Sequence, residues 1–172
     1  MLDPMIHVCS LARLHDTIAD TRARHVVSLI GEQARLQWPA GIAPEHHLWL
    51  QLHDIAAPLE GYVLPDEKHV ADLLDFVREW DRRAPLVMHC YMGISRSTAS
   101  AFAGVCALNP QRDEHSIAQA LRRASPTATP NIRIVSLADR LLGRGGRMVD
   151  AIETIGRGNL AEEALPFRLE LD

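Results

Sequence analysis

A strand-like run that ends in a cysteine constrains the possible folds of this chain more than any other sequence feature. The residues PLVMHC at 85–90 form an apolar run typical of a buried strand, and TASAFAGVCAL at 98–108 is helix-like. Only YMGISRS at 91–97 separates them, and Gly93 permits a tight backbone there. A loop between a strand end and a helix N-terminus presents several backbone N–H groups to one point, and the helix dipole adds to their field. The sequence therefore predicts a compact anion site with Cys90 at its base.

Strand-like and helix-like segments alternate through the first half of the chain. Leu48, Leu50 and Leu52 recur at a period of two, whereas the segment after Pro65 and Asp66 has apolar residues at helical spacing. This alternation predicts an α/β fold with a central, mostly parallel sheet flanked by helices. The expected strands are MIHVCSL (5–11), RHVVSLIG (24–31), HHLWLQLHDI (46–55) and PLVMHC (85–90), and the expected helices are ARLHDTIADTRA (12–23) and PDEKHVADLLDFVREW (65–80).

The second half of the chain is predicted to be a layer of helices. Apolar residues recur at helical spacing in three windows, around 117–124, 134–141 and 148–155. Pro126, Pro130 and the stretch GRGGR at 143–147 punctuate these helices but are too short to separate domains. We therefore expect a single domain over residues 1–172, with residues 156–172 as a loosely docked C-terminal tail.

Composition narrows the possible functions. No apolar run approaches the roughly 20 residues that span a bilayer, and the N-terminus lacks the pattern of a secretion signal, so we expect a cytoplasmic protein without membrane association. Three dispersed cysteines suit neither a disulfide framework nor a zinc site. A net charge of −4 argues against nucleic-acid binding, which requires a clustered basic face. We expect no metal and no cofactor.

The residue types in the predicted anion loop suit nucleophilic attack on a phosphate. The positive field of the loop favours thiolate over thiol at Cys90, and the thiolate is the nucleophilic form. Arg96 follows after five residues, and its planar guanidinium can hold two phosphoryl oxygens while charge redistributes in the transition state.

The segment HCYMGISRS resembles the signature loop of the cysteine-dependent protein tyrosine phosphatases, HCxxGxxR followed by Ser or Thr. Its GxSRS ending is similar to that of the dual-specificity branch. The resemblance implies that Cys90 forms a phosphocysteine, that Arg96 binds the phosphoryl group and that Ser97 helps the thiolate leave. The family's histidine, here His89, orients the loop, although a strand histidine with satisfied hydrogen bonds fits this position equally. The main-chain donors expected to hold the phosphate belong to Tyr91, Met92, Gly93, Ile94, Ser95 and Arg96.

A phosphatase of this type also needs a carboxylic acid that protonates the leaving oxygen. The resemblance implies an Asp about thirty to forty residues before the cysteine, and Asp54, at the end of HHLWLQLHDI, fits this position. Asp66 is the competitor, but its place before an amphipathic segment suits a helix cap better. The tryptophan-led WPD form of this loop is absent. Farther on, SPTATPNIRIVS at 125–136 resembles the Pro-Asn segment of dual-specificity phosphatases.

Several alternatives stand beside this hypothesis. The doublet His53-Asp54, with His46 and His47 nearby, could belong to a metal-dependent phosphohydrolase, but it ends a strand, so we interpret these as surface histidines. The loop could bind a phosphorylated partner without turnover, as in a pseudophosphatase, or act on phosphoinositides. Non-basic residues at 91, 92 and 94 favour phosphoprotein or phosphopeptide substrates, and leave phosphotyrosine and phosphoserine or phosphothreonine both open. Isolated arginines that could hold an acidic substrate are Arg122, Arg123 and Arg133.

Overall fold

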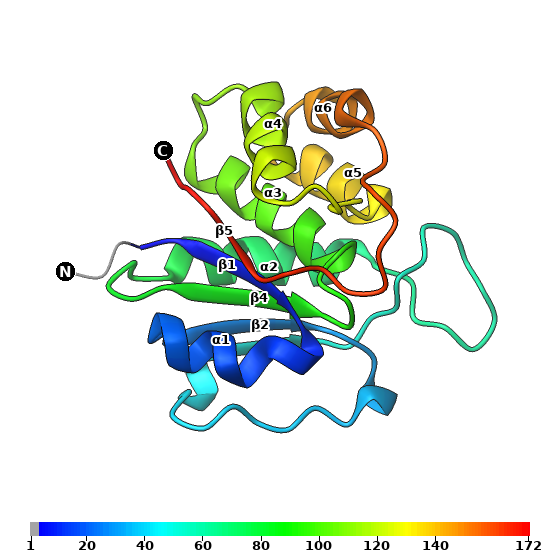
Figure 1. The fold of residues 1–172 in the computed structure, drawn as a ribbon. Coiled ribbons are helices and arrows are strands. Elements are labelled where there is room, and N and C mark those ends of the chain that lie inside the picture. Colours follow the sequence, from blue (N-terminus) through cyan, green and yellow to red (C-terminus); the bar gives the residue numbers. More distant parts are fainter. Residues whose placement is uncertain (1–3) are drawn as a thin grey trace.

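A five-stranded sheet forms the centre of the molecule in a computed structural model, which describes residues 4–172 (Figure 1). Four strands are parallel, and the fifth is antiparallel to its neighbour β1. The order across the sheet is β3-β2-β4-β1-β5, so that β4, which carries the cysteine, lies in the middle. The strands are β1 (Ile6–Ser10), β2 (His25–Leu29), β3 (His47–Leu50), β4 (Leu86–Cys90) and β5 (Phe167–Leu169).

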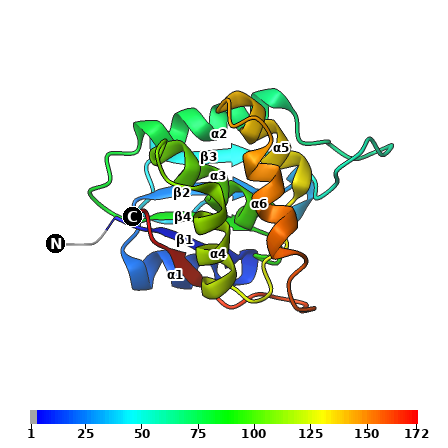
Figure 2. The same ribbon diagram turned by 90° about the horizontal axis from the view of Figure 1, so that it is seen from above.

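Helices cover both faces of the sheet, as predicted. One helix, α1 (Leu14–Thr21), packs on one face, and the other five lie on the opposite face (Figures 1 and 2). The predicted fold class is therefore confirmed. These five helices are α2 (Glu67–Glu79), α3 (Arg96–Leu108), α4 (Glu114–Ala124), α5 (Ile132–Leu141) and α6 (Arg147–Ile155), and short 3₁₀ turns occupy Leu11–Arg13, Glu32–Ala34 and Pro44–His46.

Alternate residues of β4 serve the two faces of the sheet. Leu86, Met88 and Cys90 belong to the main core under α2 to α6, whereas Val87 packs in a smaller cluster on the α1 side. Both faces are buried, which explains why β4 is a continuous apolar run in the sequence.

Helix α3 runs through the main core and directly follows the predicted anion loop. Its residues from Ser97 to Cys106 are all buried, and most of them are small. A Cβ at Gly104 would lie 3.3 Å from Ile6 Cδ1 and 3.4 Å from Met88 Cε, so the helix lies close against β1 and β4. This packing fixes the N-terminus of α3 relative to the carboxyl end of β4.

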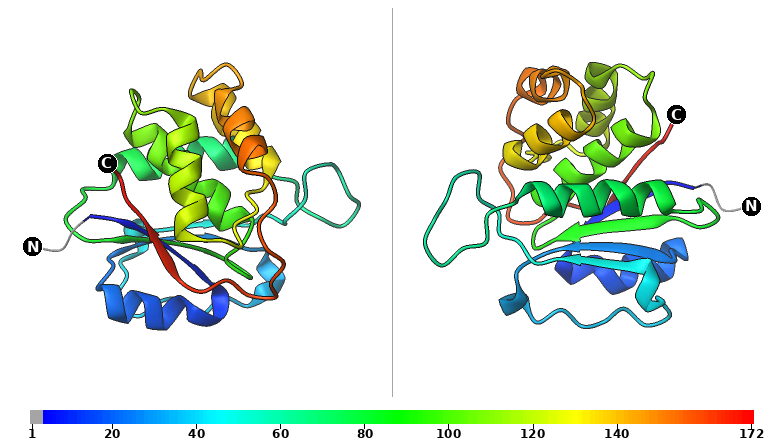
Figure 3. Two further views of the ribbon diagram at one scale, coloured as in Figure 1. Left: turned by 45° about the horizontal axis from the view of Figure 1, so that its top comes forward. Right: turned by 180° about the vertical axis from the view of Figure 1, so that it is seen from behind.

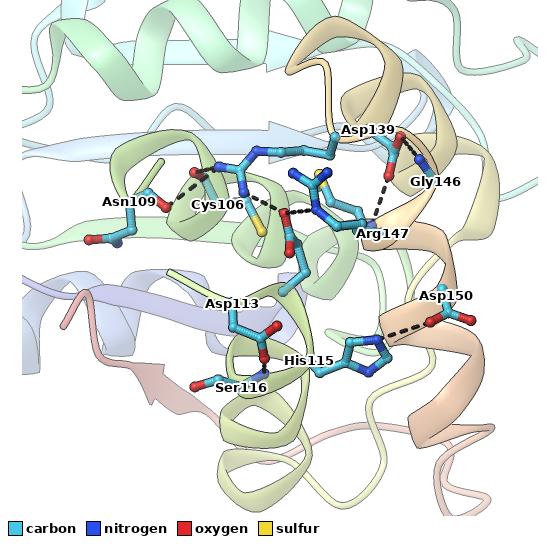
Figure 4. A network of polar contacts seen from close by, with 12 residues as sticks. Cys106, Asn109, Asp113, His115, Ser116, Asp139, Gly146, Arg147 and Asp150 are labelled. Atoms are coloured by element: carbon cyan, nitrogen blue, oxygen red, sulfur yellow. Dashed lines mark hydrogen bonds and ion pairs between the residues drawn. The ribbon is translucent and has the colours of Figure 1, made fainter. Parts of the chain in front are cut away.

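Polar contacts join α3 to α4, α5 and α6 (Figure 4). The buried Arg144 donates to Glu114 Oε1 at 2.6 Å and to the Cys106 carbonyl at 2.6 Å. Asp139 accepts the N–H groups of Gly146 and Met148 at 2.7 and 2.8 Å, at the start of α6. The GRGGR stretch does form a helix end, as predicted, and one of its arginines also completes a buried ion pair.

The C-terminal segment differs from the expected loosely docked tail. Residues 167–169 form β5, which pairs with β1 along the edge of the sheet (Figure 3). Leu169 and Ala164 are buried, and Asn109 Nδ2 donates to the Leu171 carbonyl at 2.6 Å. The expectation of loose docking was wrong because β1 offers a free edge whose backbone groups this segment satisfies.

Among residues 4–172, no helix is both long enough and apolar enough to cross a membrane.

Candidate active site

The predicted anion loop joins the carboxyl end of β4 to the N-terminus of α3. Cys90 is the last residue of the strand, residues 91–95 form the turn, and α3 begins at Arg96. The side chain of Cys90 lies at the bottom of this turn and is 2% exposed. In open parallel sheets, ligands bind outside the carboxyl ends of the strands, and this loop occupies such a place.

The main-chain carbonyls of the loop accept hydrogen bonds from four residues in three different segments of the chain. Over residues 4–172, by contrast, no hydrogen bond uses an N–H of residues 91–96 as its donor. Bonds to the carbonyls hold the loop from outside and leave its N–H groups available to an anion. The bonds join Tyr91 O to Leu11 N (3.1 Å), Met92 O to Ala164 N (3.0 Å), Ile94 O to Thr129 N (2.9 Å) and Ser95 O to Asn131 N (3.1 Å).

Gly93 allows the loop to lie directly against β1. Its φ of +73° is in the left-handed region, which favours glycine. A Cβ there would lie 2.9 Å from the carbonyl carbon of Cys9 and 3.0 Å from Ser10 N, both in the backbone of β1. Glycine is therefore required by backbone conformation and by space, as the prediction of a tight turn implied.

Ser97 contacts the cysteine. Its Oγ lies 3.0 Å from Cys90 Sγ, and the residue is fully buried. A hydroxyl at this distance can donate a hydrogen bond to a thiolate, which is the contact that the proposed role of Ser97 requires.

Arg96 lies between the loop and the end of β3. One guanidinium nitrogen, Nη1, donates to the Leu52 carbonyl at 3.1 Å. Nε is buried and has no hydrogen-bond partner among the described residues. Because a buried donor without a partner is unfavourable, a bound oxyanion would satisfy it.

Asp54 lies beside the loop, where the resemblance implied an Asp. Its Oδ1 accepts hydrogen bonds from Ser95 Oγ at 2.7 Å and from Asn131 Nδ2 at 2.9 Å. No hydrogen bond of the described residues reaches Oδ2. Asp54 is exposed, so this oxygen is accessible to water and to a molecule bound at the loop. Asp66 instead caps α2, where its Oδ1 accepts from His69 N at 2.9 Å, as predicted for a helix cap.

Solved structures share this fold. The structure of DUSP15 matches with a TM-score of 0.65 at 16% sequence identity, over 90% of this chain and 94% of that one. The PTP-2 phosphatase of Cydia pomonella matches at 0.60 and 17%, over 99% and 100%. The human tyrosine phosphatase-like serine/threonine/tyrosine-interacting protein matches at 0.60 and 14%, over 81% and 92%. This chain has the fold of the dual-specificity protein tyrosine phosphatases. No family model matches the chain, and no curated protein matches its sequence.

Within this phosphatase fold, His89 is part of a buried hydrogen-bonded chain. Its Nε2 lies 2.6 Å from Ser28 Oγ, which lies 2.8 Å from His47 Nε2. Its Nδ1 lies 3.4 Å from the carbonyl oxygen of Cys90. With Nδ1–H directed at that carbonyl, Nε2 accepts from Ser28, and Ser28 accepts from His47. His89 is thus a strand histidine whose hydrogen bonds are satisfied, and it also contacts the backbone of the cysteine.

Burial lowers the pKa of both His47 and His89. The pKa of His89 is lowered to about 4 mainly by burial, and that of His47 to about 4 by the same cause. Both rings are therefore neutral at neutral pH. His47 is 8% exposed, so the interpretation of this residue as a surface histidine was wrong.

The side chains of the His53-Asp54 doublet contact different parts of the molecule. His53 Nδ1 accepts from Val63 N at 2.8 Å, whereas Asp54 accepts from Ser95 in the loop after β4. His46 stacks on His25 with ring centroids 4.1 Å apart. In the part of the chain from residue 4 onward, no group of three or more His, Cys, Asp and Glu side chains could hold a metal ion.

Two of the arginines considered for substrate binding hold backbone carbonyls instead. Arg122 donates to four of them, and Arg133 Nε donates to the Pro65 carbonyl at 2.6 Å. The sequence did not predict the hydrogen bond from Asn131 to Asp54, which joins Asp54 to the start of α5. The Pro-Asn segment was its only signal in the sequence.

Proposed function

We propose that this protein hydrolyses phosphomonoesters on proteins or peptides, without a metal, through a phosphocysteine intermediate. The observation that carries the proposal is the set of free donors around Cys90. The N–H groups of residues 91–96 donate no hydrogen bond within residues 4–172, and the buried Arg96 Nε has no partner there. A phosphoryl group has oxygens enough to accept from all of them, and the preorganised donors stabilise charge that develops in the transition state.

The reaction has two steps. In the first, the Cys90 thiolate attacks phosphorus, the bond from phosphorus to the leaving oxygen breaks, and Asp54 gives its proton to that oxygen. In the second, water attacks phosphorus, Asp54 takes its proton, and the sulfur–phosphorus bond breaks. Ser97 donates a hydrogen bond to the departing thiolate, which lowers the barrier to this second step.

Hydrolysis of p-nitrophenyl phosphate in the presence of a chelator tests the proposal. We expect turnover without added metal, inhibition by vanadate, which mimics the five-coordinate transition state, and no turnover by Cys90→Ser. Retained turnover in that variant would contradict the covalent mechanism. Loss of activity in chelator that a divalent metal restores would favour the metal-dependent alternative.

A phosphate-binding module is the second candidate, because one structural neighbour is named a tyrosine phosphatase-like interacting protein. Binding of a phosphopeptide by the wild-type protein, without release of phosphate, would support this candidate over the enzyme. The contacts of Ser97 with Cys90 and of Asp54 with the loop favour the enzyme, since mere binding requires neither.

A further inference from the structure

A pocket of about 200 Å³ adjoins the proposed active site on the side of Asp54. Asp54 and Ser95 form one wall, and residues 157–161 of the C-terminal segment form another. Arg157 is the only cationic residue that lines the pocket. A group bound here would therefore lie next to a phosphate held by the loop.

The backbone on both sides of Arg157 is held in place. The carbonyl of Gly156 accepts from Arg122 Nη2 at 2.8 Å, and Gly158 N donates to Thr129 Oγ1 at 3.1 Å. A Cβ on Gly158 would lie 2.5 Å from the carbonyl carbon of Thr127, so only glycine allows this close packing. The backbone position of Arg157 is consequently fixed relative to the pocket.

The guanidinium of Arg157 has no partner in the structure. It makes no ion pair or hydrogen bond with any residue from 4 to 172, and its side chain is exposed. The neighbouring Arg122 differs, because it uses its donors on four backbone carbonyls. Arg157 is thus the cation beside the site that remains free to bind a second anion.

The opposite side of the loop carries the opposite charge. A pocket of about 290 Å³ there is lined by Tyr91 and Met92 together with Glu162 and Glu163. Glu163 Oε1 accepts from Ser10 Oγ at 2.6 Å, and Ala164 N donates to the Met92 carbonyl at 3.0 Å, so this end of the segment is also anchored. One segment therefore places a positive charge on one side of the phosphate site and negative charges on the other.

Resting on the proposed function, we infer that Arg157 binds a second anionic group of the substrate, a carboxylate or phosphate carried by a phosphopeptide on one side of its phosphorylated residue. The acidic side chains across the loop disfavour an anion on the other side. A phosphoinositide would present several phosphates, and a single arginine opposed by two glutamates suits a peptide better.

The test compares kcat/KM for phosphotyrosine peptides with either Glu or Ala two residues before, or two residues after, the phosphotyrosine. The readout is the ratio of the Glu peptide to the Ala peptide, so any general loss of activity cancels. We expect one of the two placements, but not both, to show a ratio of about three to five, the range of a favourable exposed ion pair. Arg157→Met should bring that ratio to about one.

Arg83→Met is the matched control, because Arg83 is exposed and precedes β4 at the opposite end of the strand from the loop. It should keep the wild-type ratio. Equal ratios for both placements, or a preference that survives Arg157→Met, would overturn the inference. An Arg157→Met variant that loses activity only toward a soluble phosphoinositide, and not toward the peptides, would also overturn it.

Peptide binding by Cys90→Ser, measured by fluorescence anisotropy, separates this inference from the proposed function. If the wild-type protein hydrolyses no substrate, the proposed function fails. The same preference for the Glu peptide in binding, and its loss when Arg157→Met is added, would still support the role of Arg157. Equal affinities for Glu and Ala peptides would refute that role whether or not the protein turns over.

Discussion

Acid should destabilise this protein through the histidine pair behind the cysteine, and His47→Gln should remove part of that effect. His47 and His89 are buried, and burial lowers the pKa of each to about 4. In the unfolded chain their pKa returns to about 6.5. The unfolded state therefore binds more protons than the folded state between these pH values. The free energy of unfolding is accordingly highest above pH 6.5 and falls as the pH drops toward 4.

The magnitude follows from the two pKa values. A group that titrates near 6.5 when unfolded and near 4 when folded removes about 2 kcal/mol of stability between pH 8 and pH 5. Two such groups remove up to about 4 kcal/mol, a large part of the 5–15 kcal/mol that is typical of a domain. His47→Gln eliminates one group, while its amide can still donate to Ser28.

Urea unfolding followed by circular dichroism at several pH values between 7.5 and 5, at constant ionic strength, measures this effect. We expect the free energy of unfolding of the wild-type protein to fall about 2 kcal/mol further than that of His47→Gln over this range. A change in stability that is independent of pH cancels in this comparison. Gln111→Asn, at an exposed position that carries no titratable group, is the control and should follow the wild-type curve. Parallel curves for the wild-type protein and His47→Gln would refute the reasoning.

Three further predictions concern the site itself. Asp54→Ala should lower kcat by about 10² to 10⁴, and by less for substrates whose leaving group needs no proton. Asp66→Ala should instead reduce stability by about 1 kcal/mol at unchanged kcat, and the reverse result would reassign the acid. Gly93→Ala should distort the loop, because the added Cβ would meet backbone rather than a mobile side chain, so we expect activity to fall at least tenfold together with the melting temperature. An alanine variant with wild-type activity would contradict the loop geometry. Mild peroxide should modify Cys90 before the other two thiols, since burial raises the pKa of both of those to about 12. Mass spectrometry that finds all three labelled equally would disprove this.

The elements whose burial is periodic were predictable from the sequence. Val70, Leu73, Leu74 and Val77 are the buried residues of α2, and their spacing alone gave the helix and the face it buries. The loop from Cys90 to Arg96 was predictable for another reason. Its conformation depends on residues that adjoin in the chain, so strand end, glycine and helix start could be identified together.

The partners of individual side chains were not predictable, because the fold and not the local sequence brings them together. Asn131 contacts Asp54 across 77 positions, and Arg144 pairs with Glu114 across 30. A sequence pattern assigns an arginine to the end of a helix, but it does not distinguish one that is buried and paired from one that is solvated. The error at His47 has the same origin, since a strand histidine is exposed or buried according to what packs over it.

The C-terminal segment shows that the geometry of the site depends on residues that belong to no recognisable sequence motif. Its strand has only three residues and no clear period, so its pairing with β1 leaves little trace in the sequence. Yet Ala164 N in this segment holds the Met92 carbonyl, one of the four outward contacts that keep the loop's N–H groups free. In the proposed reaction the signature residues supply the nucleophile and the guanidinium, whereas segments distant in the sequence hold the loop that carries both. A chain could therefore retain every residue of the signature and still lose the site if this segment were displaced.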